Sequence, residues 1–161
     1  MVRLLFKQSL SWFAVLLCMV VIYLLSAQPA SLSNGNSKVI VTRMVDTTVN
    51  ITKAEIAEPE KVKLIDRINA IAREYMHGVV FLALGLLTQN ASTQSGAKGR
   101  KAIVISLAIC LLYGITDEIH QLFVPGRAFQ ISDLVMDAIG SIIGIVSMWF
   151  LYNRVQIKPK S

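Results

Sequence analysis

A block of ionisable and amide side chains interrupts the apolar sequence between Thr116 and Gly144. Its members, in chain order, are Asp117, Glu118, His120, Gln121, Arg127, Asp133 and Asp137. Carboxylates beside a histidine can divide into a proton donor and a proton acceptor, which is the chemistry of general acid–base catalysis. The same groups can bind a cationic or amide-bearing headgroup, or a divalent cation. The block is therefore the candidate functional site, with Asp117, Glu118 and His120 as the candidate catalytic residues.

Residue spacing places parts of this block on common helix faces. Asp117, His120 and Gln121 stand at i, i+3 and i+4, so a helix brings them to one face. Asp133 and Asp137 are four residues apart and also share a face. The spacing therefore predicts two acid-bearing helix faces, one before and one after a short connection.

A turn signal and a pair of glycines predict how these two faces meet. Pro125-Gly126 predicts a turn that suspends Arg127 over the acids. Further along, Gly140-x-x-x-Gly144 continues the face of the two aspartates and permits a neighbouring helix to approach closely. We therefore expect the C-terminal helix to pack tightly while it presents its acids to the other helices.

The elements that position these residues are predicted to be membrane helices. Of the 161 residues, 54% are hydrophobic and the mean hydropathy is +0.58, which is too apolar for an ordinary soluble domain. Backbone groups in lipid must be hydrogen-bonded internally, so each apolar run should be helical. The expected fold is a single all-α integral membrane domain over residues 1–161, with spans of roughly 10–26, 68–89, 102–121 and 131–152. Cys18 and Cys110 lie inside apolar runs, so neither a disulfide nor a zinc–cysteine site is expected.

The first apolar run has two interpretations. It follows Arg3 and Lys7 and could be a signal peptide. Its core is long, however, and no clean small-x-small cleavage site follows Leu25. We therefore expect a retained membrane anchor.

The charged residues predict the orientation of the spans. Eight basic residues and no acid occupy the N-terminus, the loop between the second and third spans, and the C-terminus. All ten acids lie toward the opposite side, together with the other eight basic residues. The positive-inside rule then places both termini in the cytoplasm and the segments 27–67 and 122–130 outside. The net charge of +6 reflects this topology, so no nucleic-acid partner is expected.

Counting residues places part of the polar block inside the membrane. A hydrocarbon core about 30 Å thick needs about 20 helical residues. The third span has only 15 uncharged residues (102–116) before Asp117, and the fourth has only 16 (138–153) after Asp137. Counted from the cytoplasmic boundary, Asp117, Asp137 and Arg73 therefore share a depth of about 22 Å, and His77 lies about one turn deeper. Their charges can neutralise one another at that depth.

The outer segment 27–67 divides into two parts. Ser, Asn, Gly and Pro dominate residues 28–37, which predicts a loop. Residues 39–52 are rich in Val, Ile and Thr, which favours a short strand pair, although a surface helix is also compatible. From Pro59 the apolar residues have helical spacing, so we expect a helix that starts there and continues into the second span.

The residues assembled above resemble the VanZ-like family of bacterial membrane proteins, named for a member linked to glycopeptide (teicoplanin) resistance. Three blocks carry the resemblance, which covers most of the chain apart from residues 39–63. They are Ser26-Ala27-Gln28-Pro29 with Ser33-Asn34, Arg73-x-x-x-His77 with Phe81 and Leu84-Gly85, and Asp117-Glu118-Ile119-His120-Gln121-x-Phe123-x-Pro125-Gly126-Arg127 with Asp133, Asp137 and Gly140. The resemblance implies a multi-pass protein of the bacterial cytoplasmic membrane and an effect on antibiotic sensitivity, but it implies no reaction.

The chain departs from the family pattern at three positions. The family usually has lysine where Glu74 stands, tyrosine where Phe81 stands and glycine near Ala128. Glu74 reverses a charge beside the candidate site, and Phe81 removes a hydroxyl. A role that requires either missing group is not expected in this chain.

The leading functional hypothesis is a polar site, open to the outside, that binds or shields an outer-leaflet amphiphile or a cell-wall precursor. Its predicted binding residues are Arg73, His77, Asp117, Glu118, His120, Gln121, Arg127, Asp133 and Asp137. The alternative is a membrane-embedded enzyme that hydrolyses or transfers a lipid or wall-precursor headgroup. In that case Asp117 or Glu118 is the base, His120 moves the proton and Arg127 holds an anionic group.

Two further interpretations remain open. The charged groups could be a structural clamp that fixes the register of the helices without chemistry. A transporter would need a dimer, because four helices are few for a solute path. Membrane lipids are the expected partners, and a homo-oligomer is compatible with the sequence. No His-Glu-x-x-His or comparable motif is present, so we expect neither a metal nor another cofactor.

Overall fold

The computed structural model describes residues 2–53 and 55–157, with side chains from Leu5 onward except at positions 73, 74 and 155–157. This part of the chain forms five helices and no strand. The helices are α1 (Val2–Ser26), α2 (Ala30–Thr52), α3 (Glu58–Gln94), α4 (Arg100–Gln121) and α5 (Ile131–Ile157). Among the described residues, α1, α3, α4 and α5 are long and apolar enough to cross a membrane. The all-α prediction and the four expected spans are therefore confirmed as helices.

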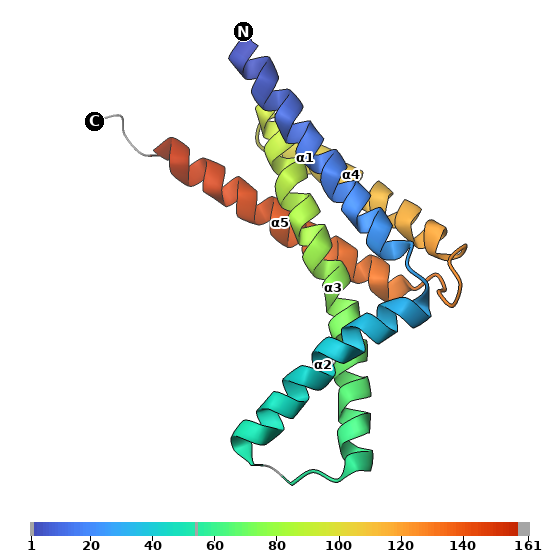
Figure 1. Cartoon of the computed structure of the whole chain (residues 1–161). Coiled ribbons are helices and arrows are strands. Elements are labelled where there is room, and N and C mark those ends of the chain that lie inside the picture. Colours follow the sequence, from blue (N-terminus) through green and yellow to red (C-terminus); the bar gives the residue numbers. More distant parts are fainter. Residues whose placement is uncertain (1, 54, 158–161) are drawn as a thin grey trace.

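The most extensive helix contact joins α3 and α5, which cross in the middle of the molecule (Figure 1). A Cβ atom on Gly140 would collide with the backbone carbonyl of Gly78, and one on Gly144 with the carbonyl of Leu82. On the α3 side, a Cβ atom on Gly85 would collide with the backbone of α5. The close approach predicted from Gly140-x-x-x-Gly144 is confirmed, and the partner helix is α3.

A common core holds α1, α3, α4 and α5 together. Its fully buried side chains are Val15, Ile22, Phe81, Leu84, Ala91, Cys110 and Ile145. Val15 and Ile22 show that α1 is a packed member of the bundle. The indole N–H of Trp12 also donates a hydrogen bond to Ser95 Oγ, 2.9 Å away, at the end of α3. Helix α1 is therefore packed against the other three apolar helices.

Different segments of the chain meet at the two ends of the bundle. At one end, the Gln8 side chain donates to the carbonyl of Gln94, whose own amide donates to the hydroxyl of Tyr152. The first part of α1, the end of α3 and the last part of α5 therefore meet there. At the opposite end, the Ala30 N–H donates to the carbonyl of Pro125 at 3.2 Å. That bond joins the corner between α1 and α2 to the connection between α4 and α5.

Helix α2 replaces the loop and strand pair predicted for residues 28–52. Val41 and Val45, one helical turn apart, are buried against Ile65 of α3. Salt bridges flank this contact, with Lys38 Nζ 2.6 Å from Asp66 Oδ1 and Lys61 Nζ 2.7 Å from Asp46 Oδ1. Packing of one valine face on α3 outweighs the weak strand preference of β-branched residues. The surface-helix alternative was therefore the correct interpretation.

The residues at the start of α3 are typical of the first turn of a helix. Glu58 and Glu60 occupy its first turn, where the helix dipole favours acids, and Pro59 stands where no backbone donor is needed. The helix then runs without interruption into the second span, as expected. Figure 1 shows α2 and this first part of α3 projecting together from the bundle. They form an angled pair beside the end that carries the candidate site.

Candidate functional site

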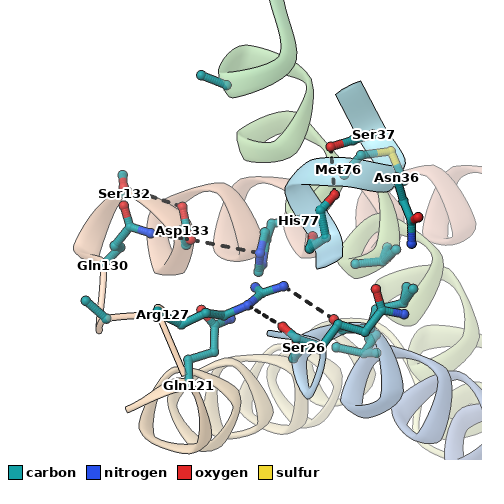
Figure 2. A pocket seen from close by; sticks show the side chains of 18 of the residues that line it. Ser26, Asn36, Ser37, Met76, His77, Gln121, Arg127, Gln130, Ser132 and Asp133 are labelled. Atoms are coloured by element: carbon teal, nitrogen blue, oxygen red, sulfur yellow. Dashed lines mark hydrogen bonds and ion pairs between the residues drawn. The ribbon is translucent and has the colours of Figure 1, made fainter. Parts of the chain in front are cut away.

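A pocket of about 710 Å³ lies where α1 ends, α2 begins and the α4–α5 connection crosses the bundle. Its polar lining comprises Ser26, Gln28, Ser33, Asn36, Ser37, His77, Gln121, Arg127, Gln130, Ser132 and Asp133. Its other lining residues are Ile22, Leu25, Ile40, Ala70, Met76, Val80, Gly126 and Ala128. Figure 2 shows side chains from all five helices and the α4–α5 connection converging on this space. The pocket is therefore a product of the tertiary fold and not of one segment.

His77 of α3 lies between the two aspartates of α5. Its Nε2 is 3.9 Å from Asp133 Oδ2, and its Nδ1 is 3.4 Å from Asp137 Oδ1. Because the two aspartates are one turn apart, both carboxylates face the same imidazole. The side chain of Asp137 is only 2% exposed, so this contact is shielded from the surroundings. The acid-bearing face predicted for the last helix is confirmed, and it faces α3.

The two acids of α4 are buried and tie that helix to its neighbours. Asp117 Oδ2 accepts hydrogen bonds from Ser26 Oγ at 2.8 Å and from Gln121 Nε2 at 3.2 Å. Glu118 Oε2 accepts the backbone N–H of Gln130 at 2.8 Å. The first acid therefore joins α4 to the end of α1, and the second joins α4 to the segment that leads into α5.

Arg127 closes the α4–α5 connection over the end of α1. Its Nε donates to the carbonyl of Gln28 at 3.1 Å, and its Nη2 donates to the carbonyl of Leu25 at 3.4 Å (Figure 2). The last carbonyls of a helix lack partners within the helix and carry the negative end of its dipole. A guanidinium is therefore well placed to satisfy them, and it forms one wall of the pocket.

Two buried carboxylate oxygens at this site have no hydrogen-bond partner among the described residues. They are Glu118 Oε1 and Asp137 Oδ2, whereas His77 Nδ1 and Asp137 Oδ1 pair with each other at 3.4 Å. Buried polar atoms are normally bonded, and leaving one unsatisfied costs about 1–3 kcal/mol. These two oxygens indicate a site whose polar network is completed by something other than these side chains.

The sequence of the chain matches the model of the VanZ/LLP1 family over residues 11–152, which include every residue that lines the pocket. The chain belongs to the VanZ/LLP1 family. Together with the four apolar helices, this membership makes it a multi-pass membrane protein. Neither a search of curated proteins nor a search of solved structures found a match.

The structure of this VanZ/LLP1 protein gathers most of the predicted binding residues around one site. Those that line the pocket are His77, Gln121, Arg127 and Asp133. Those that are buried, each in contact with a residue at the pocket, are Asp117, Glu118 and Asp137. The side chain of Arg73, a predicted binding residue, and that of Glu74 lie outside the described residues.

His120 is the one described binding residue that stands apart from this group. Its ring lies against Tyr23 of α1, with the ring centroids 4.7 Å apart. Asp117 and Gln121 do share a face and a hydrogen bond, as expected. Successive helical residues are about 100° apart, however, so His120 and Gln121 point in clearly different directions. The i, i+3, i+4 spacing predicted one shared face for Asp117, His120 and Gln121. In α4, however, His120 packs on Tyr23, whereas Gln121 bonds Asp117.

Three of the polar pocket residues that are absent from the predicted binding set belong to α2. Ser33, Asn36 and Ser37 stand at i, i+3 and i+4 and line the pocket from one helix face. The same spacing rule could have found them, but the Ser, Asn and Gly content of residues 28–37 favoured a loop. Ser26 was part of the family resemblance, and the structure adds its hydrogen bond to Asp117.

The departure of this VanZ/LLP1 chain at Phe81 falls outside the pocket. Phe81 is fully buried in the core, and its ring centroid is 6.1 Å from that of Tyr113. The absence of a hydroxyl at this position therefore removes no group from the pocket lining.

Proposed function

We propose that this protein binds the headgroup of an amphiphile, an outer-leaflet lipid or a lipid-linked cell-wall precursor, at the outer side of the bacterial cytoplasmic membrane. The observation that carries the proposal is the pocket itself, a space of about 710 Å³ with both polar and apolar walls at one end of a membrane bundle. Polar groups at such a position are costly and are typically retained for function. By holding or shielding this amphiphile, the protein would alter sensitivity to glycopeptide or lipoglycopeptide antibiotics.

The charge pattern supports an outward-facing pocket. The hydrogen bonds that link Gln8, Gln94 and Tyr152 lie at the end of the bundle that is next to the basic segments. The positive-inside rule assigns this end to the cytoplasm. The pocket lies at the opposite end, beside the α4–α5 connection, and would therefore open to the outside.

Exposed apolar side chains near the pocket favour an amphiphile over a fully water-soluble ligand. Leu32 and Ile40 of α2 are 60% and 63% exposed, and Phe123 of the connection is 80% exposed. Apolar surface of this kind is unfavourable in water but is solvated by lipid chains. Ile40 also lines the pocket, so a chain packed on this surface would lead directly to a headgroup held inside.

The lining indicates the chemistry of the headgroup. Hydroxyl and amide side chains dominate its polar part, and these can both donate and accept hydrogen bonds. Among the residues that the structure describes, Asp133 is the only carboxylate in the lining, and it would attract a cationic group or an amide N–H. Four acids were predicted to contact the ligand. Three of them, Asp117, Glu118 and Asp137, are buried outside the lining.

Lipid retained during purification tests the binding proposal. We expect Asp133→Ala to lower the amount of bound amphiphile, measured by native mass spectrometry of the detergent-purified protein, by about tenfold. Loss of one hydrogen bond to a charged group costs about 1.5–3 kcal/mol, which supports a change of this size. The matched control is Asp66→Ala, because Asp66 is exposed and pairs with Lys38 away from the pocket. Equal lipid retention in both variants would contradict the proposal.

Cysteine labelling tests the proposed orientation. We expect Gly35→Cys, in open space on α2, to react with a membrane-impermeant maleimide in intact cells. Ser95→Cys, at the exposed end of α3, should react only after the membrane is permeabilised. Wild-type protein measures the background from Cys18 and Cys110, which are partly or fully buried. The opposite labelling pattern would reverse the orientation.

The enzyme alternative has less support from the geometry. It assigns proton transfer to His120, which packs on Tyr23 and does not line the pocket. Its proposed bases, Asp117 and Glu118, are also buried outside the lining. A new covalent product in the lipid or wall-precursor profile of cells that contain the protein would nevertheless favour the enzyme over the binding module.

A further inference from the structure

Three helices bring potential metal ligands together beside the pocket, two of them in its lining and the third buried behind it. His77 of α3, Glu118 of α4 and Asp133 of α5 each offer one ligand atom, and these atoms all lie within 4.8 Å of one another. Ligand atoms around one metal with bonds of about 2.0–2.2 Å lie roughly 3–4 Å apart, so small side-chain rotations would close the site. We propose that these three residues bind one divalent transition-metal ion, Zn²⁺ or Mn²⁺.

The atoms of Glu118 provide an independent observation. Its side chain is fully buried, at 0% exposure. The Oε2 atom accepts the backbone N–H of Gln130, which fixes the carboxylate, whereas Oε1 has no hydrogen-bond partner among the described residues. A buried, oriented carboxylate oxygen without a donor is costly unless a cation satisfies it. A metal shared with His77 and Asp133 supplies that cation.

Asp137 orients His77 for this role. Its Oδ1 lies 3.4 Å from His77 Nδ1, while His77 Nε2 lies 3.9 Å from Asp133 Oδ2. A separation of 3.9 Å is too long for a hydrogen bond but is compatible with two ligands of one metal. Metal-binding histidines commonly direct their other ring nitrogen to a carboxylate, which fixes the tautomer and the ring orientation. Asp137 is therefore a positioning residue, and Nε2 is the ligand atom.

The donor set selects the class of metal. One imidazole and two carboxylates neutralise the charge of a divalent ion, and they mix the nitrogen and oxygen ligands that suit Zn²⁺ and Mn²⁺. Mg²⁺ and Ca²⁺ prefer oxygen ligands alone. Because His77 and Asp133 also line the pocket, the remaining coordination positions would face it. This proposal replaces the expectation, based on missing motifs, that the protein binds no metal.

Metal binding by the full-length protein in detergent tests the inference. After removal of metals with a chelator and addition of Zn²⁺ or Mn²⁺, elemental analysis of the desalted protein should find about one ion per chain. Calorimetric titration should show at least tenfold weaker binding for His77→Gln and Glu118→Gln. Asp137→Asn should weaken binding by about 10–100-fold, the usual effect of removing a carboxylate that supports a histidine ligand.

The chain offers matched controls for both ligand types. His120→Gln removes the only other histidine, and Glu58→Gln removes an exposed glutamate at the start of α3. Both variants should bind the metal with wild-type affinity. If wild-type protein retains no ion after desalting, or if the controls lose binding as strongly as the ligand variants, the proposed site is wrong.

A spectroscopic measurement on wild-type protein tests the site without relying on variants that fold poorly. Electron paramagnetic resonance of bound Mn²⁺ should detect coupling to one imidazole nitrogen, and the same signal should persist in His120→Gln. Bound Mn²⁺ without nitrogen coupling would overturn the assignment to His77. The measurements use protein freed of lipid, so their outcome does not depend on the proposed binding of an amphiphile.

Discussion

Replacing Gly140 with leucine is expected to destabilise the bundle by about 3 kcal/mol or more. Overpacking in a rigid core costs typically about 1–3 kcal/mol, and here the obstruction is backbone and cannot rotate away. A Cβ atom on Gly140 would collide with the carbonyl oxygen of Gly78 and approach its carbonyl carbon to 2.8 Å. Because α3 and α5 form the most extensive contact of the fold, their separation would also disrupt the pocket.

The thermal unfolding midpoint in detergent measures this effect. A loss of about 3 kcal/mol lowers the midpoint of a chain of this size by roughly 6–12 °C. The matched control is Gly35→Ala, because a Cβ atom on Gly35 meets nothing within 4 Å and alanine favours the helix. This control should keep or slightly raise the midpoint. A wild-type midpoint for Gly140→Leu would show that α3 and α5 are not packed as described.

Removing the imidazole of His77 is the second change with a large expected effect. In the presence of a chelator, we expect His77→Leu to lower the free energy of unfolding by about 3–5 kcal/mol, the usual cost of breaking a buried charged pair. The physical reason is that Asp133 and Asp137, which lie 3.9 and 3.4 Å from the ring nitrogens, lose their shared partner. His120→Leu should cost less, because the half-buried His120 ring packs against Tyr23 and forms no salt bridge with any of the described residues.

A double variant separates the electrostatic effect from lost packing. His77→Leu combined with Asp137→Leu replaces both members of the pair by apolar side chains, which is often far less costly than removing one partner. We expect the double variant to recover more than half of the stability that His77→Leu loses. The measurement is a double-mutant cycle of unfolding free energies in one detergent. Additive losses would show that His77 and Asp137 do not interact.

The polar block lies within the part of the chain that matches the VanZ/LLP1 family. Residues 11–152 match the VanZ/LLP1 family, and the polar block that prompted the resemblance forms one side of the pocket. Its members divide by position. Asp133 and Gln121 face the pocket, whereas Asp117 and Glu118 are buried and hold α4 to its neighbours. Part of the block is therefore a structural clamp, and part is available to a ligand.

Helix α2 marks the limit of prediction from composition. Its residues have weak helical preference, and the valines that favoured strands form a helical face instead. The decisive interaction is the contact of Val41 and Val45 with Ile65, about 20 residues later in the chain. Local propensities differ by only about 1 kcal/mol or less per residue, so one buried apolar contact can reverse them. The polar face of α2 then follows from the same rotation and reaches the pocket.

The four apolar helices, the asymmetric distribution of basic residues and the close approach at Gly140-x-x-x-Gly144 could be predicted from the amino-acid sequence. These features depend on residues near one another in the chain, because hydropathy and helical spacing are local properties. The contact of His77, and not His120, with the aspartates of α5 could not be predicted in this way. That choice depends on how each helix is rotated about its axis, and packing between distant segments sets the rotation.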